Sequence, residues 1–200
     1  MLFRSGFSRV YVDLDGGEFT PELWQKQLNE GRSFVTTGPM LEVLMNDGRF
    51  EFRNSKPYRL GVIVDVRIAG EVLSQYPLDR IEIVNSEGLV RVTRPTEQTK
   101  QTGEYFINRF LEKLNVDHST WFVVRCFEKL PDGRLRFAHS APAFVDFEDS
   151  PVRPRRDQVR YLIQRCEEEI ARNKDVLSDA ELAEYREALE FYRGKLAEAR

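Results

Sequence analysis

The chain up to residue 150 consists of short apolar runs separated by turn residues. In Tyr58–Ile68 apolar residues stand at every second position, which is typical of a half-buried strand. Hairpin signals such as Pro131-Asp132-Gly133 follow several runs. Strands at this spacing indicate a predominantly antiparallel, β-sandwich-like domain. The other strands that the pattern predicts are Ser8–Val12, Ser33–Thr37, Leu41–Met45, Arg49–Arg53 after the turn Asn46-Asp47-Gly48, Leu78–Asn85, Leu89–Arg94, Thr120–Glu128, Arg134–His139 and Ala143–Phe147.

One segment of this region fits two kinds of element. In Tyr105–Leu114 the spacing of Phe106 and Phe110 suits one face of a helix, whereas the aromatic content and the neighbouring turns suit a strand. We favour a strand. The polar stretch Pro95–Gly103 that precedes it is predicted to be an exposed, mobile loop.

Helical patterns occur once near the start and again after Pro151. A short helix is expected over Pro21–Asn29, with Thr20 as its N-cap and Gly31 at its end. The two later stretches carry apolar stripes at helical spacing, and Ser178 begins a capping box before the second. We therefore divide the chain into a β-sandwich-like domain, residues 1–150, and a C-terminal antiparallel helical hairpin, residues 151–200. A lone hairpin cannot bury both stripes, so it is expected to pack on the β-domain or on another chain.

Composition narrows the range of functions. The net charge of −3, from 30 basic and 33 acidic residues, gives no basic face for nucleic acid. No apolar run reaches the roughly 20 residues that span a bilayer, and the first residues lack the apolar stretch of a signal peptide. The two cysteines, Cys126 and Cys166, are interpreted as small apolar residues rather than as a disulfide framework or a zinc motif. These features do not indicate the cellular compartment of the protein.

The reactive side chains do not form a recognisable catalytic set. His118 lies in a polar turn, and His139 ends a strand at a bend that its ring can fix by a hydrogen bond. Both are only weak candidates for metal ligands, since a hydrolytic metal cluster needs several converging ligands. Ser140 lacks the sequence context of a nucleophile elbow. The acidic cluster at residues 13–18 lacks the later ligands of a calcium loop, so we interpret it as a turn.

The segment Thr36-Thr37-Gly38-Pro39 offers hydroxyls beside a glycine, as a phosphate cradle does. A cradle also needs several glycines and a helix N-terminus, which are missing here. We interpret the segment as the exit of a strand. In this interpretation Gly38 permits an unusual backbone angle, and Pro39 stiffens the next segment of the chain.

Four segments of this chain form an ordered set. They are Arg9–Val12 leading to Trp24, Gly31–Leu41, Ile81–Gly88, and the pair Trp121–Cys126 with Ala138–Val145. In this order they resemble the C-terminal half of carbaryl-hydrolase-like (CehA/McbA-type) metallohydrolases of the polymerase-and-histidinol-phosphatase (PHP) superfamily. The helical tail matches in placement, so the resemblance covers most of the chain. Gly31–Pro39 is its most specific part.

The resemblance implies a partner. Family members carry an N-terminal PHP domain whose His and Asp residues bind two or three divalent metals and activate water to hydrolyse esters, carbamates or phosphoesters. That domain would end just before Arg9, and no residue before Arg9 is His, Asp or Glu, so no metal ligand carries over. The resemblance implies metals in the PHP domain alone and no cofactor for this chain. A turn common in relatives is not evident at Phe50–Pro57.

We therefore expect a non-catalytic accessory region that packs against a PHP catalytic domain, shapes its substrate mouth or forms homo-oligomers. Arg9, Tyr11 and Trp24 are candidates for the junction, because they lie nearest that domain in sequence. One alternative is a free-standing module that binds a carbohydrate or a protein. Its candidate stacking residues are Trp24, Tyr58, Tyr76, Tyr105 and Trp121. The other alternative is a metal-dependent hydrolase that acts alone on esters or phosphoesters.

Overall fold

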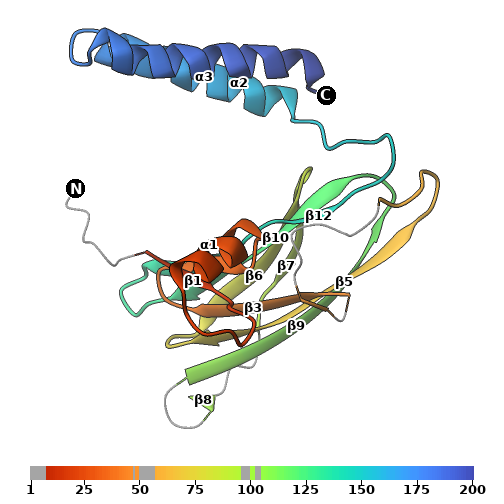
Figure 1. The fold of residues 1–200 in the computed structure, drawn as a ribbon. Coiled ribbons are helices and arrows are strands. Elements are labelled where there is room, and N and C mark those ends of the chain that lie inside the picture. The colour runs from red at the N-terminus through yellow and green to blue at the C-terminus, as the bar shows by residue number, and fades with distance from the viewer. Residues whose placement is uncertain (1–7, 47, 50–56, 96–99, 102–104) are drawn as a thin grey trace. The chain divides into compact units, whose positions relative to one another are not determined.

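The structure, a computed structural model, describes residues 8–46, 48–49, 57–95, 100–101 and 105–200. It divides into two compact units, Met1–Pro151 and Val152–Arg200. The first unit contains all the strands and the helix α1 (Figure 1). Its elements are β1 (Arg9–Val12), α1 (Pro21–Asn29), β2 (Ser33–Thr36), β3 (Met40–Met45), β4 (Gly48–Arg49), β5 (Val64–Ser74), β6 (Leu78–Asn85), β7 (Gly88–Thr93), β8 (Lys100–Gln101), β9 (Tyr105–Val116), β10 (Thr120–Lys129), β11 (Leu135–Ser140) and β12 (Ala143–Val145).

The strands form two antiparallel sheets. The seven-stranded sheet has the order β1-β2-β11-β10-β6-β7, and β12 also pairs with β10. The five-stranded sheet has the order β4-β3-β5-β9-β8. The chain crosses from the first sheet to the second directly after β2, at residues 37–39.

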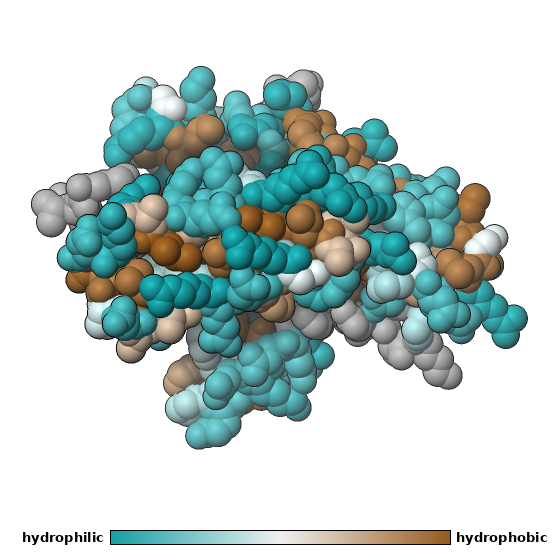
Figure 2. Space-filling view, turned by 90° about the horizontal axis from the view of Figure 1, so that it is seen from above, coloured by the Kyte–Doolittle hydropathy of each residue, from teal (hydrophilic) through white to brown (hydrophobic). Residues whose placement is uncertain are grey.

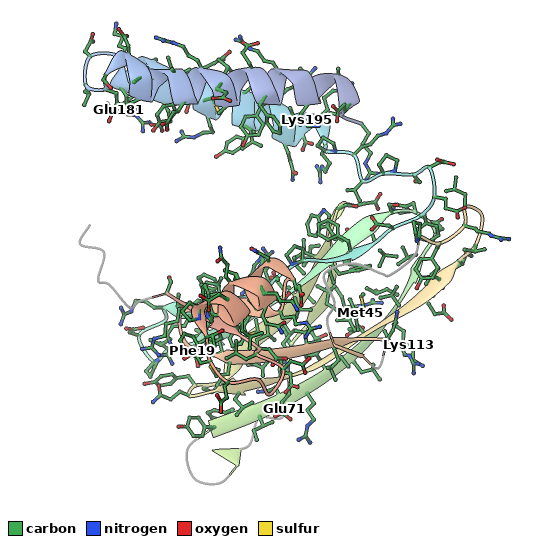
Figure 3. All side chains as sticks on the ribbon, in the orientation of Figure 1. Phe19, Met45, Glu71, Lys113, Glu181 and Lys195 are labelled. Atoms are coloured by element: carbon green, nitrogen blue, oxygen red, sulfur yellow. The ribbon has the colours of Figure 1, made fainter. Side chains whose placement is uncertain are left out.

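A single apolar core joins the two sheets. Alternate residues of β5 and β9 in the smaller sheet and of β6 and β10 in the larger sheet point into it, for example Val66, Ile68, Phe110, Ile83, Phe122 and Val124. Met45 packs against this core, whereas Glu71 and Lys113 extend from the other face of the smaller sheet (Figure 3). This arrangement confirms the predicted sandwich-like antiparallel fold. It also confirms Tyr105–Leu114 as part of a strand, β9.

The first long strand of the smaller sheet was predicted too early. The strand expected over Tyr58–Ile68 is β5, which begins at Val64 and continues to Ser74. Gly61 adopts a positive φ of 83° in a turn, so the residues before Val64 cannot continue the strand. Gly70 interrupts the apolar pattern of β5, so the pattern does not predict the part of the strand that follows it. The Cβ position of Gly70 is taken up by the Phe110 ring and the Glu42 carbonyl oxygen, so the missing side chain is replaced by a neighbour from β9.

Two other strand-region predictions fall largely on residues that are not described. The return strand Arg49–Arg53 lies mostly outside the described ranges, as does most of the predicted loop Pro95–Gly103. Of the hairpin, β4 (Gly48–Arg49) is described, and it pairs antiparallel with β3 as predicted. Within that predicted loop the structure describes Lys100–Gln101 as a strand that pairs with β9.

The helix α1 has the ends that the sequence predicts. The Thr20 hydroxyl accepts a hydrogen bond from the Leu23 backbone N–H at 3.1 Å, and Pro21 occupies the first turn. Gly31 follows with a φ of 74°, a left-handed conformation that suits glycine at a helix end. The helix lies between β1 and β2 in the chain, beside the edge of the larger sheet (Figure 1).

The second unit is a helical hairpin of α2 (Arg156–Asn173) and α3 (Asp179–Glu198). The predicted capping box is present, since Ser178 and Glu181 bond each other's backbone N–H groups. Val159, Leu182 and Leu189 are buried between the helices, whereas Tyr161 and Phe191 are 60% and 59% exposed. Hydrophilic and hydrophobic residues are interleaved on the surfaces seen in Figure 2.

Candidate functional site

The segment Thr36–Pro39 is a corner whose hydroxyls are used internally. The Thr36 hydroxyl donates to the Pro39 carbonyl oxygen at 2.6 Å and accepts from the Gly38 N–H at 2.8 Å. The Thr37 hydroxyl accepts from the Phe137 N–H of β11 at 2.9 Å. These bonds close the turn that carries the chain from one sheet to the other. The threonines therefore hold the corner, in agreement with a strand exit rather than a phosphate cradle.

Gly38 lies against a buried ion pair that the sequence analysis did not identify. Glu128 on β10 is fully buried, and Arg136, directly opposite on β11, pairs with it through Nε. A Cβ atom on Gly38 would collide with the Glu128 carboxylate and with Arg136. The backbone angle of Gly38 is not in the left-handed region, so the expected reason for this glycine was wrong. Glycine is required because the pair occupies the space of a side chain.

The turn between β5 and β6 completes the surroundings of the pair. The Tyr76 N–H donates to the second oxygen of Glu128 at 3.2 Å. Arg136 Nη2 donates to the Gln75 side-chain oxygen at 3.3 Å, and its guanidinium lies 5.4 Å from the centre of the Tyr76 ring. Alternation along β10 places Glu128 on the same face as the buried Cys126, which is the signal that could have identified it.

Glu82 on β6 is a second buried carboxylate, on the opposite face of the larger sheet. Arg80 Nε donates to one of its oxygens at 2.5 Å, and Arg125 on β10 pairs with the other. Burial alone would raise the pKa of Glu82, but the two arginine hydrogen bonds outweigh burial and hold that pKa below its ordinary value. Arg80 also covers the ring of Phe127 at 3.9 Å. These ion pairs therefore link β6 to the adjacent strand β10, and they engage the guanidinium groups of both arginines.

Two hollows flank the first strand. We call the first the apolar groove; it has a volume of about 670 Å³, lies between β1–β2 and the margin of β3, and is lined by residues that include Tyr11, Phe34 and Leu41. The arginine-lined hollow, of about 720 Å³, lies beside the corner and includes Arg9, Arg134 and Arg136. Tyr11, Met40 and Leu73 line both. Of the two hollows, the corner residues Thr36, Thr37 and Gly38 line only the arginine-lined one.

The three predicted junction residues do not all lie together. Tyr11 stacks on Phe34 with ring centres 5.2 Å apart, and it lines both hollows. Arg9 is exposed, and of the two hollows it lines only the arginine-lined one. Trp24 is half-buried on α1 and lines neither hollow. The structure therefore places Arg9 and Tyr11 on one surface and Trp24 outside it.

The histidines occupy separate places. His139 Nδ1 lies 2.7 Å from the Ser140 carbonyl oxygen, at the bend before β12. His118 lies in the turn between β9 and β10, 2.6 Å from Asp117 and 3.8 Å from Glu87. The His118 hydrogen bond holds the pKa of Asp117 below its ordinary value. The two rings thus sit in different local bonding networks.

The remaining nucleophile candidates are occupied or buried. The Ser140 hydroxyl donates to the Ala141 carbonyl oxygen at 2.8 Å and accepts from the Val124 N–H at 3.0 Å. Burial raises the pKa of the Cys126 thiol to about 12, so little reactive thiolate forms at neutral pH. Cys166 on α2 is only partly buried. The acidic segment forms a turn in which Asp13 accepts from the Asp15 N–H at 2.8 Å.

The aromatic residues considered for ligand stacking are spread over the fold. Tyr76 lies beside Glu128, near the end of β10, and Tyr105 is the first residue of β9. Tyr58 packs on Phe147, and Trp121, the second residue of β10, lies opposite Phe144 of β12, so both are far from the Glu128 end of β10. These residues do not form one stacking platform.

In the part of the chain that the structure describes, no group of three or more His, Cys, Asp and Glu side chains is placed to hold a metal ion. None of the described helices has the length and apolar content that crossing a bilayer requires. Comparisons with protein-family models, curated proteins and solved structures gave no match.

Proposed function

We propose that this chain is a non-catalytic accessory region of a PHP-type metallohydrolase and that it packs against the catalytic domain through β1. The ordered resemblance of Arg9–Trp24, Gly31–Leu41 and the later segments supports this assignment. In the family arrangement the catalytic domain precedes the position of Arg9. The surface that meets it is therefore expected at the first strand.

The exposure of β1 is the observation that carries the proposal. This strand is at the margin of the larger sheet, and its side chains are exposed on both faces as far as Tyr11. Val10 is 47% exposed and Tyr11 36% exposed. Sheet margins are usually protected by charges, prolines or a covering element, because an apolar margin invites association. An apolar margin beside the apolar groove is suited to packing against another folded domain.

The test is association in trans with a purified, metal-loaded PHP domain from a carbaryl-hydrolase-like enzyme whose own C-terminal region has been removed. We expect a complex by analytical ultracentrifugation. Val10→Arg and Tyr11→Arg should each weaken it by about tenfold or more, because each buries an unpaired charge at the interface.

Val176→Arg is the matched control. Val176 lies between α2 and α3 and is 77% exposed, so the same substitution there should leave the affinity unchanged. Far-ultraviolet circular dichroism of all three variants reports whether each is folded. Absence of a complex, or equal affinity for all three folded variants, would overturn the proposal.

A further inference from the structure

We infer that the arginine-lined hollow binds a small organic anion, with an oxyanion head of the carboxylate or phosphate type on an apolar body. This inference goes beyond the proposed function: β1 contributes to both surfaces, but the ligand test uses this chain without a catalytic domain. The arginine, threonine and glutamine side chains of its lining come from four separate parts of the chain. They are β1, the corner 36–38, the turn at Gln75, and the hairpin Leu130–Arg136 between β10 and β11.

The charge of the hollow has one sign. Among the described lining residues, the charged side chains are Arg9, Arg134 and Arg136, and none is acidic. Glu128 neutralises Arg136 from behind, and Asp132 pairs with Arg134 at 2.7 Å. Within the described part of the chain, Arg9 has no such carboxylate. Among the described residues, the three arginines and the carboxylates of Glu128 and Asp132 leave one net positive charge that an anion can neutralise.

Arg136 is held in place before any ligand arrives. Its contacts with Glu128, Gln75 and the Tyr76 ring use part of the guanidinium and fix its plane. About a quarter of the side chain, 25%, remains exposed. A guanidinium fixed in this way loses little freedom when it donates its remaining N–H groups to an oxyanion.

The rest of the hollow is suited to an apolar body. Met40 and Leu73 lie opposite each other on β3 and β5, and both are more than one third exposed, at 38% and 36%. Tyr105 and Leu135 also line the hollow and are 50% and 46% exposed. A volume of about 720 Å³ falls in the range of sites for small organic ligands. Bulky apolar walls beside converging arginines select an amphipathic anion over an inorganic one.

The experiment is isothermal titration calorimetry of the full chain with matched probes at low salt. The probes are 3-phenylpropionate, phenyl phosphate, the neutral 3-phenylpropanol, and inorganic phosphate. We expect at least one of the two aromatic anions to bind about tenfold or more tightly than both the alcohol and inorganic phosphate. The ratio between 3-phenylpropionate and phenyl phosphate identifies the preferred head group.

Substitutions locate the site. Arg9→Gln and Arg134→Gln should each weaken binding of the better aromatic anion by about fivefold or more, because each removes a cation from the hollow. Arg186→Gln on the exposed surface of α3 is the matched control and should bind as the unaltered chain does. Equal binding of the alcohol, equal binding of inorganic phosphate, or full affinity in both hollow variants would each overturn the inference.

Discussion

Replacing Glu128 with alanine is expected to lower the free energy of unfolding of the β-domain by about 3 kcal/mol. The substitution removes one member of a buried ion pair, which typically costs about 3–5 kcal/mol because the partner charge loses its compensation. Arg136 is 25% exposed and can turn partly toward water, so the lower end of that range applies. The Tyr76 N–H also loses its acceptor.

Urea unfolding at pH 7, followed by tryptophan fluorescence, measures this loss. The exposed Glu148 provides the control, since Glu148→Ala should change stability by less than about 0.5 kcal/mol. The double variant Glu128→Leu with Arg136→Met should recover much of the loss, because an apolar pair can replace a buried ion pair at little cost. A loss below about 1 kcal/mol in the single variant would show that the pair does not stabilise the corner.

Gly38→Ala is expected to cost about 2–3 kcal/mol, near the upper end for inserting one carbon into a packed site. The added Cβ would collide with the Glu128 carboxylate and with Arg136, and the backbone there is fixed by the Thr36 hydrogen bonds. The neighbours can give way only by separating the ion pair. Thermal unfolding and urea unfolding of the β-domain both report this cost.

Two comparisons make the Gly38 prediction specific. In a Glu128→Ala background the same change should cost at least about 1 kcal/mol less, because the colliding carboxylate is gone. Gly194→Ala, in the interior of α3 with open space at its Cβ position, should instead stabilise the hairpin by about 0.5–1 kcal/mol. Equal costs of Gly38→Ala in the two backgrounds would contradict the proposed collision.

Local patterns predicted most of the fold. The cap at Thr20, the capping box at Ser178 and the apolar run of β10 depend on neighbours within a few residues, and the structure has them as expected. The pattern failed where a distant residue replaces a local one. Gly70 reads as a strand breaker until Phe110, 40 positions later, is seen to cover it.

The candidate site was less predictable for the same reason. The role of Gly38 depends on Glu128 and Arg136, which approach it only through the pairing of β10 with β11 and of β11 with β2. The hollow beside the corner draws its three arginines from β1 and from the hairpin between β10 and β11. Proximity along the chain to a preceding domain selected Arg9, Tyr11 and Trp24 together. The structure places Trp24 outside the hollows that Arg9 and Tyr11 line, because distance along the chain does not determine which face a helix presents.

We propose that this chain supports a catalytic domain and that it holds no catalytic metal centre of its own. The most direct test of this proposal is the divalent-metal content of the purified chain, measured by mass spectrometry after exhaustive dialysis. No stoichiometric metal is expected, and a His118→Ala, His139→Ala double variant should have the same metal content. Two or more tightly held ions per chain, lost in that variant, would contradict it, because metal-dependent hydrolysis of this class works through such clusters.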